Sequence, residues 1–395
     1  MKKALATILA LVMALALCSV SWADATEVKR EAELTAAVSN GGEIKLGADI
    51  NATITIPADK IVILDLNGKT LTGSIVNKGK LTVTGTGSVV ATAAGTAAVA
   101  NFPDGTVTLS GGTYMSASWY VIKNMGEMYI NGPVNVQKPQ GSTDTSSLID
   151  NGWYGSTDTV ANEQVQAQAN KAKLVISNGN FNGKSGAKSC SVVKNDDYGV
   201  LEISGGTFDS TANTGTDNAT TLLNWNIATI SGGTFKGMYP ISNGAYTGEA
   251  DKGQITITGG EFIGTSTIFG SGQGGNAMGS VTVSGGTFTA PALGAVYDNV
   301  DGGYTLTVSG GTFKDATGAK VDVSDYLASG KQQNADGSVS TPSSGGYYYY
   351  QPTTDTKTTD TKGSPKTFDA GIALYVGMAL TSAAGVAFVG KKRED

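Results

Sequence analysis

The sequence predicts an all-β protein that winds as a parallel β-helix, and two observations lead to this prediction. A short phrase of the type ISGGTF recurs along the chain at an almost constant interval. The composition is rich in Gly, with 55 of 395 residues, and poor in Pro, with 9, which favours turns and strands over helices. A constant period of this kind is typical of solenoids, in which each coil packs only on its neighbours.

The period is set by the aromatic residue that ends the phrase. It falls at Phe181, Phe208, Phe235, Phe262, Phe288 and Phe313. The differences between these positions are 27, 27, 27, 26 and 25 residues. With two or three short strands per roughly 26 residues and no helix between them, residues 41–325 hold about eleven coils. An antiparallel sandwich is the rival fold, but it does not predict the same residue at the same phase.

Within each copy the residues before the Gly-Gly pair alternate between apolar and polar. Leu201 and Ile203 flank Glu202, for example, and later copies repeat this pattern. A period of two predicts a strand with one buried face. Glycine then allows a tight turn. The following Phe returns to the interior, where rings of successive coils would stack at the strand spacing of about 4.8 Å.

A second element, a short apolar run that ends in Asn, also recurs. Its copies are IVN at 75–77, VIKN at 121–124, VVKN at 192–195, LLN at 222–224, ISN at 241–243 and VYDN at 296–299. Asn tolerates left-handed backbone angles, and stacked Asn side chains can hydrogen-bond along a column. The pattern predicts an Asn ladder at a turn, and a row of ligand-binding amides is the alternative.

The first coils are preceded by a segment with helical periodicity. Residues 31–38, EAELTAAV, place Leu34, Ala37 and Val38 on one helical face. We therefore expect residues 24–40 to form an N-terminal cap, whose helix closes the open end of the β-helix core and blocks edge pairing. The β-helix itself is predicted over 41–328.

The entry coils carry a resemblance to a known fold family. They read GGEIKLGADI at 41–50 and IVILDLNGKTLTG at 61–73. With the repeats, the chain resembles over about 41–325 the right-handed parallel β-helix proteins of the pectate lyase-like superfamily, particularly repeat-bearing surface proteins of gut Firmicutes. The resemblance implies right-handed winding. It is specific for the fold and says little about activity.

The N-terminus predicts export from the cell. Lys2 and Lys3 precede an apolar run that ends in small residues at 21–23, which is the pattern of a cleaved signal peptide over 1–23. Cleavage removes two of 27 basic residues and leaves 25 against 33 acidic ones, a net charge of −8. Such an acidic exterior repels phosphate backbones, so nucleic acid is not an expected partner. Cys190 remains as the one cysteine and cannot form an intrachain disulfide.

The C-terminal part predicts a spacer and a membrane anchor. Residues 329–363 are rich in Ser, Thr and Gly and are interpreted as a linker. Residues 370–390 carry no charge and as a helix would span roughly 31 Å, which predicts a transmembrane helix, with a buried soluble helix as the alternative. The basic residues within 391–395 favour a cytoplasmic tail.

The pentapeptide SPKTF at 364–368 resembles the sorting signal of Gram-positive surface proteins, a Leu-Pro-x-Thr-Gly type motif. Pro365, Lys366 and Thr367 match, whereas Ser364 replaces Leu and Phe368 replaces Gly. The resemblance implies that a sortase joins Thr367 to cell-wall peptidoglycan. Retention as a single-pass membrane protein is the alternative, and either anchor leaves the body of the protein outside the cell.

The composition disfavours catalysis. The chain has no His, and Arg occurs only at Arg30 and Arg393. The resemblance implies that lyases of this fold would use an Arg or Lys base opposite carboxylate-bound calcium, and that hydrolases would use several carboxylates. Lys194 beside Asp196 and Asp197 in KNDDYG offers such groups, but the stretch is interpreted as a turn. We expect no catalytic residue, no metal and no cofactor.

The repeat is interrupted at 137–173, where a further coil around SLIDN and an insertion are expected. Insertions on solenoids often lie on the binding face. Aromatic residues outside the Phe column are the predicted glycan-binding candidates: Trp119, Tyr120, Trp153, Tyr154 and Tyr239. The alternative is that they pack against coil edges. The predicted function is that of a non-catalytic surface display protein, an adhesin or glycan-binding module for a glycan or host-surface ligand. A polysaccharide lyase or hydrolase and a passive spacer are the alternatives.

Overall fold

The computed structural model describes residues 25–152, 172–183, 191–211, 220–244, 253–271, 279–294 and 305–342. The chain divides into two units, 1–343 and 344–395, and every described residue belongs to the first. The predicted signal peptide at 1–23, the motif Ser364 to Phe368, the apolar segment 370–390 and the tail at 391–395 lie outside the described residues. Within the described residues, no helix has the length and apolarity needed to cross a membrane.

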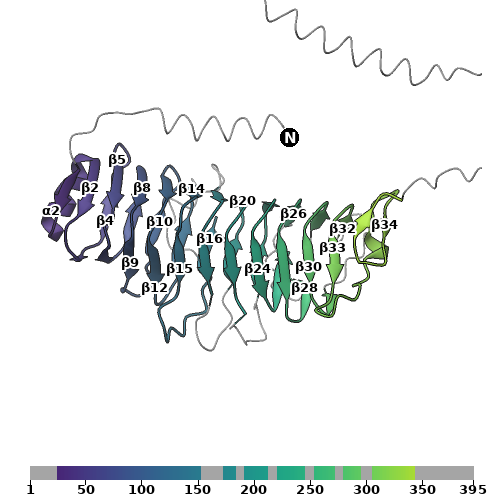
Figure 1. Cartoon of the computed structure of the whole chain (residues 1–395). Helices are drawn as coiled ribbons and strands as arrows, with labels where there is room; N and C mark the ends of the chain where they lie inside the picture. The colour runs from purple at the N-terminus through teal and green to yellow at the C-terminus, as the bar shows by residue number, and fades with distance from the viewer. Residues whose placement is uncertain are drawn as a thin grey trace, which may run out of the picture. The chain divides into compact units, whose positions relative to one another are not determined.

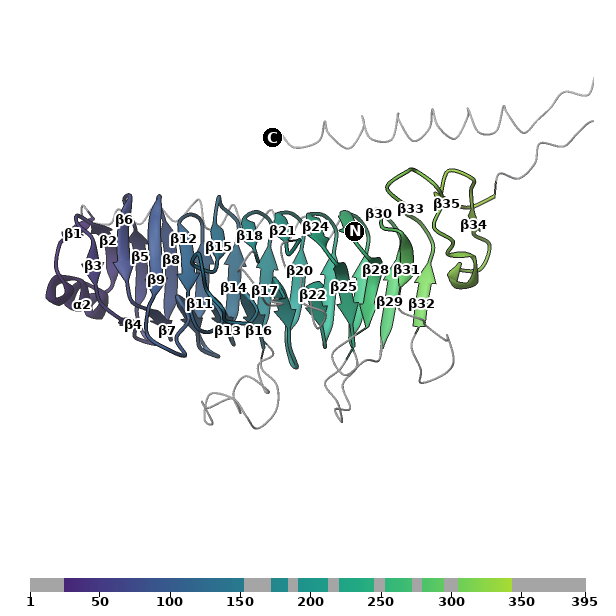
Figure 2. The same cartoon turned by 90° about the horizontal axis from the view of Figure 1, so that it is seen from below.

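The described part of the chain is built from three long parallel sheets, and successive coils contribute one strand to each sheet (Figures 1 and 2). The first sheet has 12 strands. They are β1 (Thr26–Val28), β2 (Gly42–Leu46), β5 (Ile61–Asp65), β8 (Lys80–Thr84), β11 (Thr106–Leu109), β14 (Glu127–Ile130), β17 (Lys173–Ile176), β20 (Val200–Ile203), β23 (Ile227–Ile230), β26 (Gln254–Ile257), β29 (Ser280–Val283) and β32 (Thr305–Val308).

The second sheet has 11 strands, and each of its members follows a strand of the first sheet. They are β3 (Ile50–Asn51), β6 (Lys69–Thr72), β9 (Gly87–Ala91), β12 (Thr113–Ser116), β15 (Asn135–Gln137), β18 (Asn180–Asn182), β21 (Thr207–Asp209), β24 (Thr234–Gly237), β27 (Glu261–Gly264), β30 (Thr287–Thr289) and β33 (Thr312–Lys314).

The third sheet has 10 strands and completes each coil. They are β4 (Ile54–Ile56), β7 (Ile75–Asn77), β10 (Val99–Asn101), β13 (Ile122–Asn124), β16 (Ile149–Asn151), β19 (Val193–Asn195), β22 (Thr220–Asn224), β25 (Tyr239–Asn243), β28 (Thr267–Ser271) and β31 (Ala292–Gly294). Three stacked parallel sheets are consistent with the predicted parallel β-helix. The strand β16 lies within SLIDN, where a further coil is expected.

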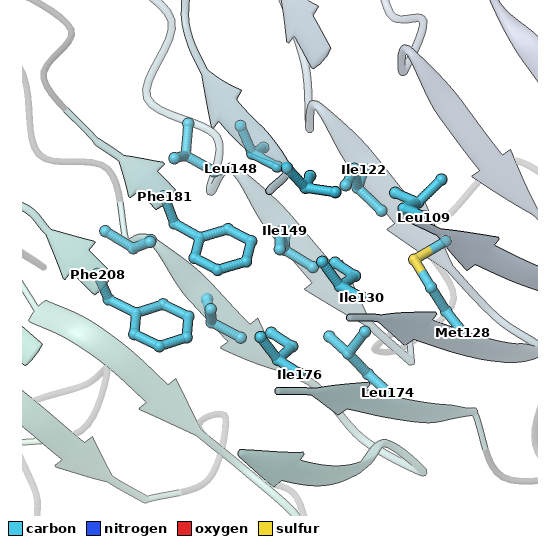
Figure 3. Close-up of a cluster of buried hydrophobic side chains, with 14 of the residues drawn as sticks. Leu109, Ile122, Met128, Ile130, Leu148, Ile149, Leu174, Ile176, Phe181 and Phe208 are labelled. Carbon is cyan, nitrogen blue, oxygen red and sulfur yellow. The ribbon is translucent and has the colours of Figure 1, made fainter. Parts of the chain in front are cut away.

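The predicted Phe column is present and lies in the core. The six rings from Phe181 to Phe313 are fully buried, and neighbouring ring centroids are 4.5–5.0 Å apart with interplanar angles of 3–9°. Figure 3 shows the first two rings beside Ile149 and Ile176, which come from the third and first sheets. The column follows from register, because each Phe pairs with the Phe of the next coil in the second sheet.

The two glycines of the repeated phrase are required for different reasons. A Cβ on Gly232, the first of its pair, would lie 2.3 Å from the carbonyl oxygen of Ser204 in the preceding coil. Gly233, the second, has a φ of +94°, which residues with a side chain rarely adopt. The same division recurs in the neighbouring copies, so the phrase is a device for turning between the first and second sheets while coils stack closely.

The predicted Asn ladder is present in the described strands, and the predicted copy VYDN at 296–299 lies outside the described residues. Its members are Asn77, Asn101, Asn124, Asn151, Asn195, Asn224 and Asn243. The side-chain amide of each of the first six donates to the Oδ1 of the next member at 2.7–2.8 Å, and all seven side chains are fully buried. For these residues the alternative of ligand-binding amides is wrong, because the amides are buried and bonded to one another.

The N-terminal end of the described stack agrees with the sequence prediction more closely than the C-terminal end does. Helix α2 (Glu31–Asn40) forms where the periodicity predicts it, with Leu34, Ala37 and Val38 buried in the main hydrophobic core. The strand β1 before it was not predicted and pairs in parallel with β2.

At the other end, the predicted linker starts too early in the chain. The 3-10 helix η1 (Ser324–Tyr326) and the antiparallel pair β34 (Gln332–Gln333) and β35 (Val339–Ser340) follow the last coil. Val339 is 7% exposed, belongs to the main core, and donates its backbone N–H to Gly311 O at 2.8 Å. Residues 329–342 therefore pack on the last coil, because one apolar side chain and backbone hydrogen bonds suffice to hold them there.

Candidate functional site

The candidate site lies at the middle position of the third-sheet strands, directly before the ladder Asn. In register along this sheet lie Ala100 of β10, Lys123 of β13, Asp150 of β16, Lys194 of β19 and Leu223 of β22. Since successive side chains of a strand point to opposite faces, these residues lie on the face opposite the core Ile and Val side chains. Two lysines and one aspartate thus alternate on three adjacent strands.

These residues form two buried ion pairs. The Lys123 Nζ lies 2.5 Å from Asp150 Oδ2, and the exposed fractions of the two side chains are 2% and 0%. The Lys194 Nζ lies 2.7 Å from Asp196 Oδ2, with exposed fractions of 8% and 1%. Asp197, next in the chain, is also buried. We call Lys123, Asp150, Lys194, Asp196 and Asp197 the charged cluster.

Burial changes the protonation of this cluster. Desolvation raises the pKa of Asp196 from 3.8 to about 7, and the nearby Asp150 carboxylate adds to the rise. The ammonium groups of Lys194 and Lys123 act in the opposite direction and lower that pKa. The Asp196 carboxyl therefore keeps its proton to a much higher pH than an exposed aspartate does, although the Lys194 ammonium lies 2.7 Å away.

Aromatic rings adjoin the two lysines. The Trp225 ring centroid lies 4.2 Å from Lys194 Nζ, and the tryptophan is fully buried. The Tyr120 ring centroid lies 5.4 Å from Lys123 Nζ, and the Trp119 and Tyr120 centroids are 5.1 Å apart. Two of the predicted glycan-binding residues, Trp119 and Tyr120, are therefore neighbours at the edge of the charged cluster, and both are half-buried. We call them the aromatic pair.

The aromatic pair is fastened by the loop that follows β15. The Lys138 ammonium donates to the carbonyl oxygen of Trp119 and forms an ion pair with Asp144 at 2.8 Å. Ser142 Oγ donates to the Ala117 carbonyl oxygen at 2.8 Å. The start of the interruption predicted at 137–173 thus supports the segment that carries the aromatic pair, and the Lys138 side chain is fully buried in doing so.

The remaining predicted site residues are placed elsewhere or not described. Tyr239 begins β25, four strands further along the third sheet than β13, and packs over Gly270 of β28. It is not brought to the aromatic pair. Trp153 and Tyr154 lie outside the described residues, as do all five residues of the predicted sorting motif.

Sequence reasoning noticed only part of the charged cluster. The interpretation of NDDYG as a turn is confirmed, since Gly199 N donates to Asp196 O at 3.0 Å. The burial of both aspartates and the contribution of Lys123 and Asp150 were missed. The available signal was the residue before each ladder Asn, which reads Lys in VIKN, Asp in LIDN and Lys in VVKN.

The charged cluster offers the amines of two lysines and the carboxyls of three aspartates, all of them buried away from water. Among the residues that the structure describes, no group of three or more His, Cys, Asp or Glu side chains could hold a metal ion. No protein family model matches the chain, and no curated protein or solved structure matches it significantly.

Proposed function

We propose that this protein is an exported, surface-anchored β-helix that binds glycans through Trp119 and Tyr120. The observation that supports binding is the aromatic pair itself, two adjacent half-buried rings on a segment fixed by Lys138 and Ser142. Flat apolar ring faces beside hydroxyl and amide groups suit the faces of sugar rings, and a pre-fixed segment lowers the entropic cost of binding. The proposed partner class is a cell-surface or host glycan.

Replacing Trp119 with alanine is expected to weaken glycan binding at least about tenfold, a loss of about 1.4 kcal/mol. The measurement is a glycan array with the purified protein, followed by titration of the glycans that bind. Tyr129, a partly buried aromatic residue of β14 in the first sheet, provides the matched control as Tyr129→Ala. Equal binding by both variants, or no binding by the unmodified protein, contradicts the proposal.

A polysaccharide lyase or hydrolase is the second candidate function, and the charged cluster favours it. Lys194 and Asp196 combine an amine with a carboxyl whose pKa is about 7, which suits acid–base catalysis near neutral pH. Its burial weighs against access by a polymer. Incubating the array-positive glycans with the protein separates the functions, because unsaturated or shortened products identify an enzyme. If the protein neither binds a glycan nor releases products, the role that remains is that of a passive surface spacer.

The fold is proposed to be a right-handed β-helix of the pectate lyase-like superfamily. The stacked parallel sheets and the entry coils support this assignment. Helix α2 is proposed as the cap of the core, since its three apolar residues are buried against the first coils and its neighbours include β2 and β4.

Anchoring rests on the sequence of the two termini. We expect residues 1–23 to direct export and 370–390 to span the cytoplasmic membrane, with 391–395 inside and the β-helix outside. Muramidase treatment of the producing cells is expected to release the protein with Thr367 joined to a peptidoglycan fragment, which mass spectrometry of the C-terminal peptide detects. Recovery of the protein only in the membrane fraction, with 368–395 intact, contradicts sortase cleavage and indicates the retained membrane anchor.

A further inference from the structure

We propose that Lys123 and Asp150 condense into an intramolecular amide bond that joins β13 to β16. The two residues are direct partners in the third sheet, so their side chains leave adjacent strands on the same face. The amine nitrogen and the carboxylate Oδ2 are 2.5 Å apart. The backbone register thus holds the two reacting groups together in every folded molecule, and such positioning greatly accelerates bond formation.

The environment favours loss of water from this pair. Lys123 and Asp150 are 2% and 0% exposed. Burying an ion pair costs the free energy of removing both charges from water. The attraction between the charges offsets this cost only where the remaining polar atoms are also hydrogen-bonded. The second carboxylate oxygen, Asp150 Oδ1, has no hydrogen-bond partner in the described part of the chain. An amide would remove both charges and leave only a neutral N–H and one carbonyl oxygen to be satisfied.

The condensation balances within the pair. The Lys123 ammonium loses two protons, a bond forms between Nζ and the Asp150 Cγ, and one C–O bond of the carboxylate breaks. The departing oxygen leaves with the two protons as one water molecule. No oxidant, reductant or cofactor is required.

Asp196 is positioned to carry the proton between these groups. Its carboxyl lies 2.7 Å from the ammonium of Lys194, and Lys194 is the register partner of Asp150 on the adjacent strand, so Asp196 belongs to the rung next to the reacting pair. Its raised pKa of about 7 lets it take a proton from the amine and return one to the departing oxygen near neutral pH. In this proposal Asp196 is the acid–base group of the condensation.

The second ion pair of the charged cluster is an internal control. Lys194 and Asp196 are two residues apart in the chain, so an amide between them would join no strands. The Lys194 ammonium lies over the Trp225 ring at 4.2 Å, and Asp196 Oδ2, although 2.7 Å away, receives no hydrogen bond within the described residues. In this pair the ammonium is shared between a carboxylate and an aromatic ring, whereas Lys123 pairs with a carboxylate on the adjacent strand.

The bond would fasten the β-helix at the start of the interrupted region. The loop of residues 138–148 separates β15 (Asn135–Gln137) from β16 (Ile149–Asn151), and it is longer than the connection of residues 117–121 that precedes β13. A covalent link between β13 and β16 prevents these two rungs from separating under pulling force or thermal opening. This consequence does not depend on glycan binding.

Peptide mapping of the full-length protein tests the bond. After tryptic digestion, the expected peptide contains both residues, is uncut after Lys123, and is lighter by one water than its sequence. Fragmentation should show the side chain of Lys123 joined to that of Asp150. An unmodified Lys123, cleaved by trypsin, overturns the proposal. Loss of water with cleavage after Lys123 also overturns it, since that result indicates cyclisation of an aspartate alone.

Three variants sharpen the test. Lys123→Arg keeps the ion pair but cannot form the bond, so its peptide is expected at full mass and its heat resistance should fall. Asp196→Asn keeps the reacting pair and is expected to leave most molecules uncondensed. Lys194→Arg should retain the bond. If Lys123→Arg does not fold, the map of the unmodified protein decides alone. Full condensation in Asp196→Asn contradicts the assigned role of Asp196.

Discussion

Replacing Phe235 with alanine is expected to lower the free energy of unfolding by about 3–5 kcal/mol. Phe235 is fully buried, and its ring stacks on Phe208 at 4.6 Å and on Phe262 at 5.0 Å. Alanine would leave a cavity in the middle of the column. That cavity cannot close without moving two coils, because backbone hydrogen bonds on either side fix their spacing.

Guanidinium-induced unfolding at neutral pH measures this loss. Thr234→Ala, one residue earlier on the other face of β24, is the matched control and should change the free energy of unfolding by less than about 0.5 kcal/mol. A Phe235→Ala protein as stable as the Thr234→Ala protein would show that the ring column adds little. Since solenoids can unfold in parts, the slope of the transition should be compared between variants before free energies are derived.

The Phe column and the strand positions could be predicted because they arise from local rules. Alternation around Glu202, the glycine turn and the returning Phe208 lie within eight residues, and the period repeats them. The Asn ladder could be predicted only in part. Asn101 and Asn151 were not recognised in advance because the sequence intervals between members vary from 19 to 44 residues, whereas the spatial step between strands is constant.

The charged cluster could not be predicted for a different reason. Lys123 and Asp150 are 27 residues apart, and their pairing depends on the exact count of residues in the coil between them. Their burial depends on the chain around them rather than on the repeat. Their position in the third sheet would by itself predict that the two side chains are exposed, because they lie on the face of the sheet that does not contact the core. The packing of 329–342 was missed likewise, because Val339 is a single apolar residue in a polar stretch.

The stability of the protein is expected to fall as the pH rises from about 4 to 8. Asp196 has a pKa of about 7 in the folded protein and about 3.8 when unfolded. Between these values the folded state binds more protons than the unfolded state, so each step upward in pH favours unfolding. The rise of about three pH units corresponds to a loss on the order of 4 kcal/mol, at about 1.4 kcal/mol per unit. The loss is nearly complete at about pH 8, one unit above the folded pKa.

Other carboxyls with altered pKa values act in a different window. Hydrogen bonds from Thr317, Ser324 and Ser338 lower the pKa values of Asp315, Asp322 and Asp336, respectively. Groups of this kind stabilise the fold above their unfolded pKa of 3.8 and lose that contribution as the pH falls. They therefore steepen unfolding in acid and leave the decline between pH 4 and 7 to Asp196.

The variant Asp196→Asn separates this mechanism from a general response to charge. Asparagine is nearly isosteric and cannot ionise, so the midpoint of thermal unfolding should become nearly independent of pH between 5 and 8. Asp104→Asn, at an exposed carboxyl, should keep the decline of the unmodified protein. A protein that is equally stable at pH 5 and pH 8 would mean that Asp196 ionises normally despite its burial. The ammonium of its ion-pair partner Lys194 would then fully offset the cost of desolvation, and Asp196 would remain ionised in the folded protein at neutral pH.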